Sequence, residues 1–71
     1  MDEKEFLQKL KENILDTDSE LTLDTPLKSV EEWDSLSFVA FGGFLAANGK
    51  AFDRDALKKA QSVGDLFALV Q

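Results

Sequence analysis

The sequence predicts an all-α fold, a small four-helix bundle with a short third helix and a long loop between helices 1 and 2. Three observations predict it. Apolar residues recur at helical spacing near both ends of the chain, an uncharged apolar stretch fills its middle, and helix-capping residues precede the last three helices. The 71 residues make one domain. We expect helices at about 2–15, 35–48, 53–59 and 62–70.

The first expected helix is amphipathic. Phe6, Leu10 and Ile14 recur at every fourth position, with Leu7 on the same side. The charged residues fall elsewhere and are expected to form an ordinary solvated surface. This spacing predicts a core-facing stripe through Phe6, Leu10 and Ile14.

A long loop is expected at 16–33, because its residues favour turns and lack helical periodicity. Thr25-Pro26 disfavours a helix at Thr25 and removes a backbone donor at residue 26. A long loop in a small domain needs anchors. The apolar residues that can supply them are Leu21, Leu23, Leu27, Val30 and Trp33. We therefore expect the loop to lie across the bundle.

The second expected helix has no ionisable residue between Leu36 and Gly49 and is apolar on more than one face, which is typical of a central or ligand-facing helix. Within it, Gly42-Gly43 costs about 0.8–1 kcal/mol per glycine relative to Ala. A close contact between helices or a local kink explains this pair more simply than a second interpretation, an acyl pocket between helices. The residues of that pocket would be Phe38, Gly42, Gly43 and Phe44.

The last two helices are shorter. Asp53 can cap a weak helix over 53–59, and Ser62-Val63-Gly64-Asp65 resembles a capping box before a second amphipathic helix. Gly49 suits the left-handed position that ends the helix before them.

Composition excludes several classes of function. The chain has no Cys and no His, so it lacks Cys/His metal sites, thiol nucleophiles and a histidine base. Its net charge of −6 argues against nucleic acid and favours basic partners. Residues 1–34 hold eleven acids and four bases, net −7. The start of the chain lacks a signal-peptide pattern and no stretch reaches transmembrane length, so we expect a cytoplasmic monomer without membrane insertion.

Ser35 is the candidate functional residue. Asp34-Ser35 before an apolar run indicates a helix start, which places the Ser35 hydroxyl at a helix tip whose partial positive charge favours a phosphoester. Asp34-Ser35-Leu36, preceded by Trp33, resembles the attachment motif of acyl carrier proteins. The resemblance extends over the expected helix order, Thr25-Pro26-Leu27 and Ser62-Val63.

The resemblance implies a non-catalytic carrier. Ser35 would receive 4'-phosphopantetheine from coenzyme A through a phosphopantetheinyl transferase, and the thiol of that arm would hold acyl groups as thioesters for loading and transfer enzymes. Asp34, Leu36 and Val39 would meet these partners. The second helix lacks the acids that members commonly carry there, so we expect partners to read apolar surface together with Glu31, Glu32 and Asp34.

Other readings stay open. An aminoacyl or peptidyl carrier is one alternative, since fatty acyl, polyketide, amino acid and D-alanyl carriers share this layout. A small helical interaction module, with Ser35 only as a helix cap, is a further alternative. A serine hydrolase lacks the histidine it needs, and the Glu31-Glu32 pair has little room for a glycosidase cleft.

Overall fold

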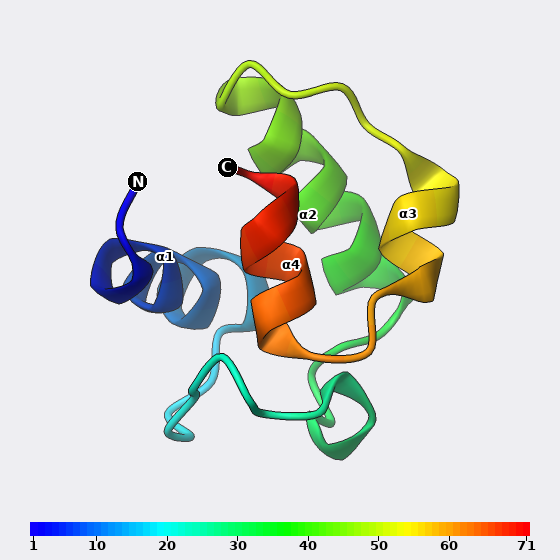
Figure 1. Cartoon of the computed structure of the whole chain (residues 1–71). Coiled ribbons are helices and arrows are strands. Elements are labelled where there is room, and N and C mark those ends of the chain that lie inside the picture. Colours follow the sequence, from blue (N-terminus) through cyan, green and yellow to red (C-terminus); the bar gives the residue numbers. More distant parts are fainter.

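Four α-helices form the frame of the computed structural model, which describes all 71 residues. They are α1 (Glu3–Lys9), α2 (Ser35–Ala47), α3 (Arg54–Lys59) and α4 (Val63–Leu69), and there is no strand. A π-helical segment, η1 (Leu10–Leu15), continues α1, and a 3-10 turn, η2 (Leu27–Ser29), lies in the long loop. Figure 1 shows α4 between α1 and α3 and in front of α2. The predicted all-α bundle is confirmed.

The end of the first helix differs from the prediction. Phe6 and Leu10 are fully buried as expected, but the next buried residue is Leu15 and not Ile14, which is half-buried. The cause is the wider π-helical turn, in which residue i pairs with residue i+5. Leu15 therefore lies below Leu10, where regular α-helical spacing would place Ile14. Asp16 then ends the segment in the left-handed conformation, with φ of 50°.

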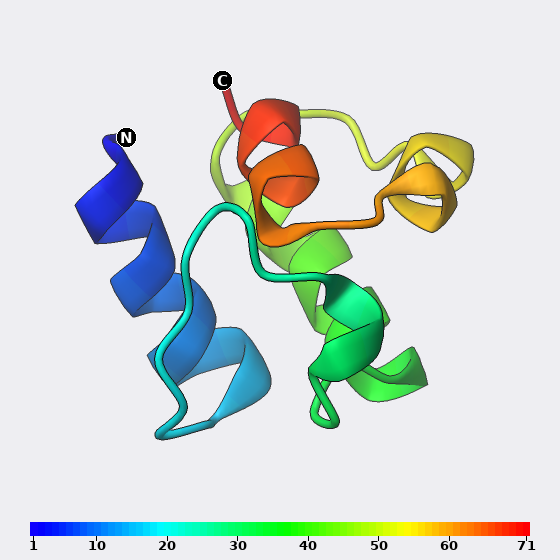
Figure 2. The same ribbon diagram turned by 60° about the horizontal axis from the view of Figure 1, so that its bottom comes forward.

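The long loop lies across the bundle, as predicted. Three backbone hydrogen bonds join it to the start of α4. Leu27 N–H donates to the Gln61 carbonyl at 2.9 Å, Val63 N–H to the Thr25 carbonyl at 3.0 Å, and Gly64 N–H to the Leu23 carbonyl at 2.7 Å. Figure 2 shows the loop passing beside the first turn of α4. These bonds fix the segment that leads to Ser35.

Aromatic rings from three helices meet in the core. Phe6 of α1 is fully buried and lies 6.3 Å from Phe41 and from Phe44 of α2, and 5.0 Å from Phe67 of α4, measured between ring centroids. Edge and tilted arrangements at these distances are favourable. Phe6 therefore links α1 to both α2 and α4.

Local sequence signals set the helix ends. Gly49 has φ of 76°, and the Gly49 and Lys50 N–H groups donate to the Ala46 and Leu45 carbonyls, which is a Schellman motif after α2. The Asp53 carboxylate accepts from Ala56 N–H, and Ser62 with Asp65 forms the capping box expected before α4. No helix combines the length and the apolar composition that crossing a bilayer requires.

Candidate functional site

The start of α2 is fixed by Asp34 and Ser37. One carboxylate oxygen of Asp34 accepts from the N–H groups of Leu36 (3.0 Å) and Ser37 (3.1 Å). In return, the buried Ser37 hydroxyl accepts from Asp34 N–H at 2.7 Å and donates to the Glu32 carbonyl at 2.9 Å. This reciprocal capping box makes Asp34 the N-cap and Ser35 the first residue of the helix.

Ser35 is exposed, and its hydroxyl takes no part in the hydrogen bonds that hold the helix start. The cap function belongs to the Asp34 side chain. The Ser35 hydroxyl is thus accessible at the positive end of a 13-residue helix, a position where negative charge is stabilised.

An open groove of about 440 Å³ begins beside Ser35 and runs between α2 and α3. Three aromatic side chains form a row along it. The Trp33 and Phe38 ring centroids lie 6.3 Å apart, and those of Phe38 and Phe52 lie 6.2 Å apart. Val39, one turn after Ser35, completes the apolar lining. The groove can therefore cover an apolar group of modest size.

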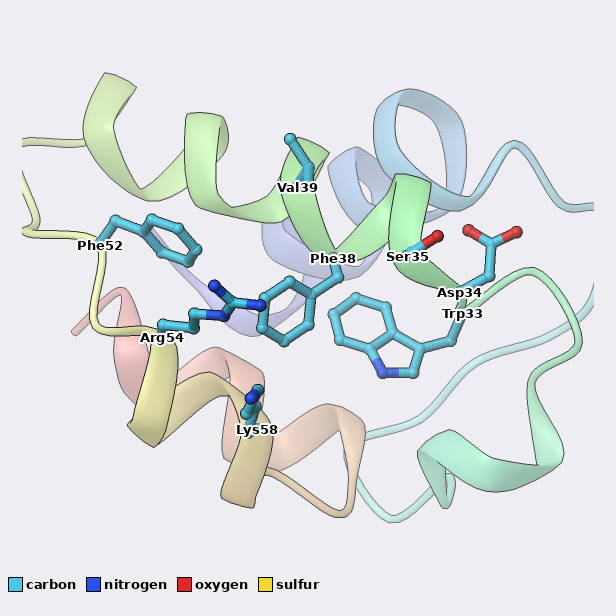
Figure 3. A pocket seen from close by; sticks show the side chains of 8 residues that line it. All are labelled: Trp33, Asp34, Ser35, Phe38, Val39, Phe52, Arg54 and Lys58. Carbon is cyan, nitrogen blue, oxygen red and sulfur yellow. The ribbon is translucent and has the colours of Figure 1, made fainter.

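The polar lining of the groove is mostly basic. Arg54 and Lys58 of α3 contribute two cations, and Asp34 contributes the single carboxylate. Figure 3 shows the Arg54 side chain between Phe52 and Phe38, with Ser35 and Asp34 beyond Trp33 and Phe38. In a chain of net charge −6, this groove is a local region of net positive charge.

The glycine pair of α2 has two different environments. A Cβ on Gly42 would lie 3.1–3.3 Å from the Phe52 ring, so the missing side chain lets Phe52 pack against the helix. This is a close contact, as the simpler interpretation proposed, although the partner is the α2–α3 loop and not a helix. Gly43 faces open space, and nothing in the structure explains it.

The structure does not bring the four proposed pocket residues together. Phe38 lines the groove, but Gly42 lies beneath Phe52, Gly43 is exposed, and Phe44 contacts Phe6 and Phe41 on the core side of α2. The groove is instead completed by Trp33, Val39 and Phe52. The helical spacing of Phe38 and Phe44 does not reveal this, because their surroundings come from other parts of the chain.

The five residues expected to meet partners all lie on the surface near Ser35. Glu31, Glu32 and Asp34 are exposed, and so are Leu36 and Val39, with 79% and 68% of their surface accessible. Glu32, Asp34 and Leu36 also line a second depression, of about 350 Å³, on the other side of the start of α2. Both acidic and apolar side chains are therefore exposed near the candidate site.

Sequence reasoning missed Ser37, Arg54 and Lys58. The spacing of Asp34 and Ser37 is that of a capping box, with Ser in place of the usual acid or amide. Arg54 and Lys58 stand four residues apart, which places them on one face of α3. That spacing was a usable signal for a basic face, but not for its position beside Ser35.

Comparisons with known proteins add no relative. No protein-family model, no curated protein and no solved structure matches this chain.

Proposed function

We propose that this chain is an acyl carrier protein in which Ser35 carries 4'-phosphopantetheine. The observation that carries the proposal is the exposed Ser35 hydroxyl at the first residue of α2, which has no structural hydrogen bond to lose. The proposal also draws on the resemblance of Asp34-Ser35-Leu36 and of the helix order to that family.

The residues around Ser35 fit a phosphoester. Ser35 Oγ would bond to the phosphorus of 4'-phosphopantetheine, the nucleotide part of coenzyme A would leave, and the transferase would take the hydroxyl proton. The N-terminus of α2 favours the added negative charge. Once bound, the arm supplies a thiol that holds the cargo as a thioester, in a fatty acid, polyketide or related pathway.

The groove offers an apolar surface against which a carried acyl group can bind. Phe38, Val39 and Phe52 offer apolar surface within reach of the Ser35 end of the groove. Burying part of an acyl chain there would remove its surface from water at about 25 cal/mol per Å². This role falls on Phe38 together with Val39 and Phe52, in place of Gly42, Gly43 and Phe44.

Partner enzymes would read the surface around Ser35 through both its acids and its apolar residues. Transfer by a general fatty-acid enzyme should weaken with salt in the native chain and lose most of that dependence in the Glu31→Gln/Glu32→Gln variant. Asp34 is left unchanged because it caps α2. A strong salt dependence that survives in the variant would place the recognition charges elsewhere.

A helical interaction module is the second candidate, and one observation favours it. The outer face of α2 is uncharged, and Leu36 and Val39 on it are largely exposed, as in a surface that docks a partner protein. In that case Ser35 would need no modification.

Intact mass separates the two functions. The chain is incubated with coenzyme A and a broad-specificity phosphopantetheinyl transferase. A carrier gains one phosphopantetheine, and the Ser35→Ala variant gains none. The matched control Ser29→Ala keeps the gain, because Ser29 is also an exposed serine but lies in η2. An unchanged mass of the native chain would reject the carrier and favour the interaction module.

A further inference from the structure

The aromatic groove has two chemically different ends. Trp33 and Ser35 lie at one end, and Phe52 and Arg54 at the other, with Phe38 between them (Figure 3). A cargo attached through Ser35 would enter at the first end and extend along the rings toward α3. Its far end would then meet Arg54, and Lys58 lines the same groove from α3.

The two cations are free to meet an anion. Neither forms an ion pair within 4.0 Å with a carboxylate of the chain, and the adjacent Asp53 carboxylate accepts from Ala56 N–H at 3.1 Å. Asp34, the one acid of the groove, uses a carboxylate oxygen to bond two backbone N–H groups. Arg54 and Lys58 are therefore not held in an ion pair within the chain.

We infer that the groove selects an apolar cargo whose far end carries an anionic group such as a carboxylate, and that Arg54 and Lys58 determine this selectivity. The inference rests on the proposed carrier function and names the class of its cargo. A neutral acyl chain would use only the aromatic row, whereas a chain ending in a carboxylate would also pair with the cations. Repulsion would exclude a cationic end.

The test compares two cargoes of equal length. The transferase loads the chain from coenzyme A thioesters of octanoic acid or of octanedioic acid, which differ only in a terminal carboxylate. Trp33 is the single tryptophan and lines the groove, so its indole resonance reports the ratio of docked to undocked cargo. We expect this ratio to be about two- to fivefold higher for the dicarboxylic cargo, as for an exposed ion pair.

Charge variants provide the matched control. Arg54→Gln/Lys58→Gln should lower the ratio for the dicarboxylic cargo to that of the octanoyl cargo. Lys59→Gln removes an exposed cation of α3 that does not line the groove, and it should leave the difference intact. Equal ratios for the two cargoes in the native chain would overturn the inference, and so would an equally large effect of Lys59→Gln.

A second experiment works on the unmodified chain. Free octanoate and neutral octan-1-ol are titrated while Trp33 fluorescence is followed. The Arg54→Gln/Lys58→Gln variant should bind octanoate about two- to fivefold more weakly than the native chain, and its affinity for octanol should be unchanged. If the variant changes the affinity for both ligands equally, the groove does not select an anionic ligand and the inference is rejected.

The two failures are distinguishable. If Ser35 takes no arm, the proposed function fails, and the free-ligand titration alone decides whether the groove prefers anions. If Ser35 is loaded but the two cargoes dock equally, the carrier function stands and only the selectivity is rejected.

Discussion

Asp34 and Ser35 are adjacent residues with different relations to α2. The Asp34 carboxylate bonds two N–H groups of the first turn, whereas the Ser35 hydroxyl bonds none of them. The interpretation of Ser35 as the helix cap therefore assigned the cap to the wrong one of two neighbours. Substitutions at the two positions should therefore change the free energy of unfolding by different amounts.

Asp34→Ala should lower the free energy of unfolding by about 0.5–2 kcal/mol, because it removes an N-cap. Ser35→Ala should change it by less than about 0.5 kcal/mol, as for an exposed residue without a structural partner. Urea unfolding followed by far-UV circular dichroism measures both. A loss in Ser35→Ala as large as in Asp34→Ala would show that the hydroxyl also supports the helix.

Gly43 and Gly42 offer a second contrast between neighbouring residues. Gly43→Ala should stabilise the chain by about 0.4–1 kcal/mol, because the site is exposed, helical and open to a methyl group. Gly42→Ala should gain less, since its Cβ would press on the Phe52 ring and shift it. Urea unfolding compares the two variants, and the Phe52 ring resonances report the shift. Equal gains with an unmoved ring would contradict the close contact.

At the scale of elements, the sequence predicted what depends on neighbours along the chain. Asp53, Ser62 and Gly49 signalled helix ends through chemistry that acts within a few residues, and all three occupy those roles. Ser35 was likewise found at the start of α2, because a capping residue and an apolar run stand side by side.

Contacts between distant segments could not be predicted in this way. Leu15 replaces Ile14 in the core because η1 widens to a π-helical turn. No residue of that stretch predicts the π-helical geometry. The position of Phe52 over Gly42 and beside Phe38 depends on how the α2–α3 loop folds back. The groove is made by such contacts, so it appeared only in the structure.

The junction between the long loop and α4 yields an element-scale prediction. Gly64→Ala should destabilise the chain by about 1–3 kcal/mol, because the added Cβ would lie 2.9 Å from the Leu23 carbonyl oxygen and break its 2.7 Å hydrogen bond. Hydrogen exchange should accelerate at the amides of Leu27 and Val63, whose hydrogen bonds also join the loop to the start of α4. Gly43→Ala serves as the control for the same substitution in an open site. Unchanged exchange at both amides would mean that the loop does not depend on this contact.

At the scale of the whole molecule, charge is divided between the surface and the groove. Most acids lie in residues 1–34, yet Arg54 and Lys58 give the groove net positive charge. Under the proposed carrier function, a partner with a basic surface would be attracted to the acids beside Ser35, and a cargo with an anionic end to the cations of α3.

The stability of the whole domain depends on contacts among very short helices. Isolated helices shorter than about 12–15 residues are marginal in water. α3 and α4 have 6 and 7 residues, and α1 has 7 before it continues as the 6 residues of η1. A chain of 71 residues is expected to have an unfolding free energy of about 4–11 kcal/mol. Phe6→Ala should remove about 3–5 kcal/mol of it, because this buried ring joins α1 to α2 and α4.

The loss of stability in Phe6→Ala should therefore affect the whole domain. The variant should unfold in one cooperative step, and α1 should not detach separately. Far-UV circular dichroism and Trp33 fluorescence should follow one transition with a lower midpoint, although Trp33 lies outside α1. Phe52→Ala is the control, since Phe52 is 49% exposed and its truncation should cost less. Two separate transitions in Phe6→Ala would contradict this dependence, because α2 and its Ser35 end would then be stable without the aromatic link to α1.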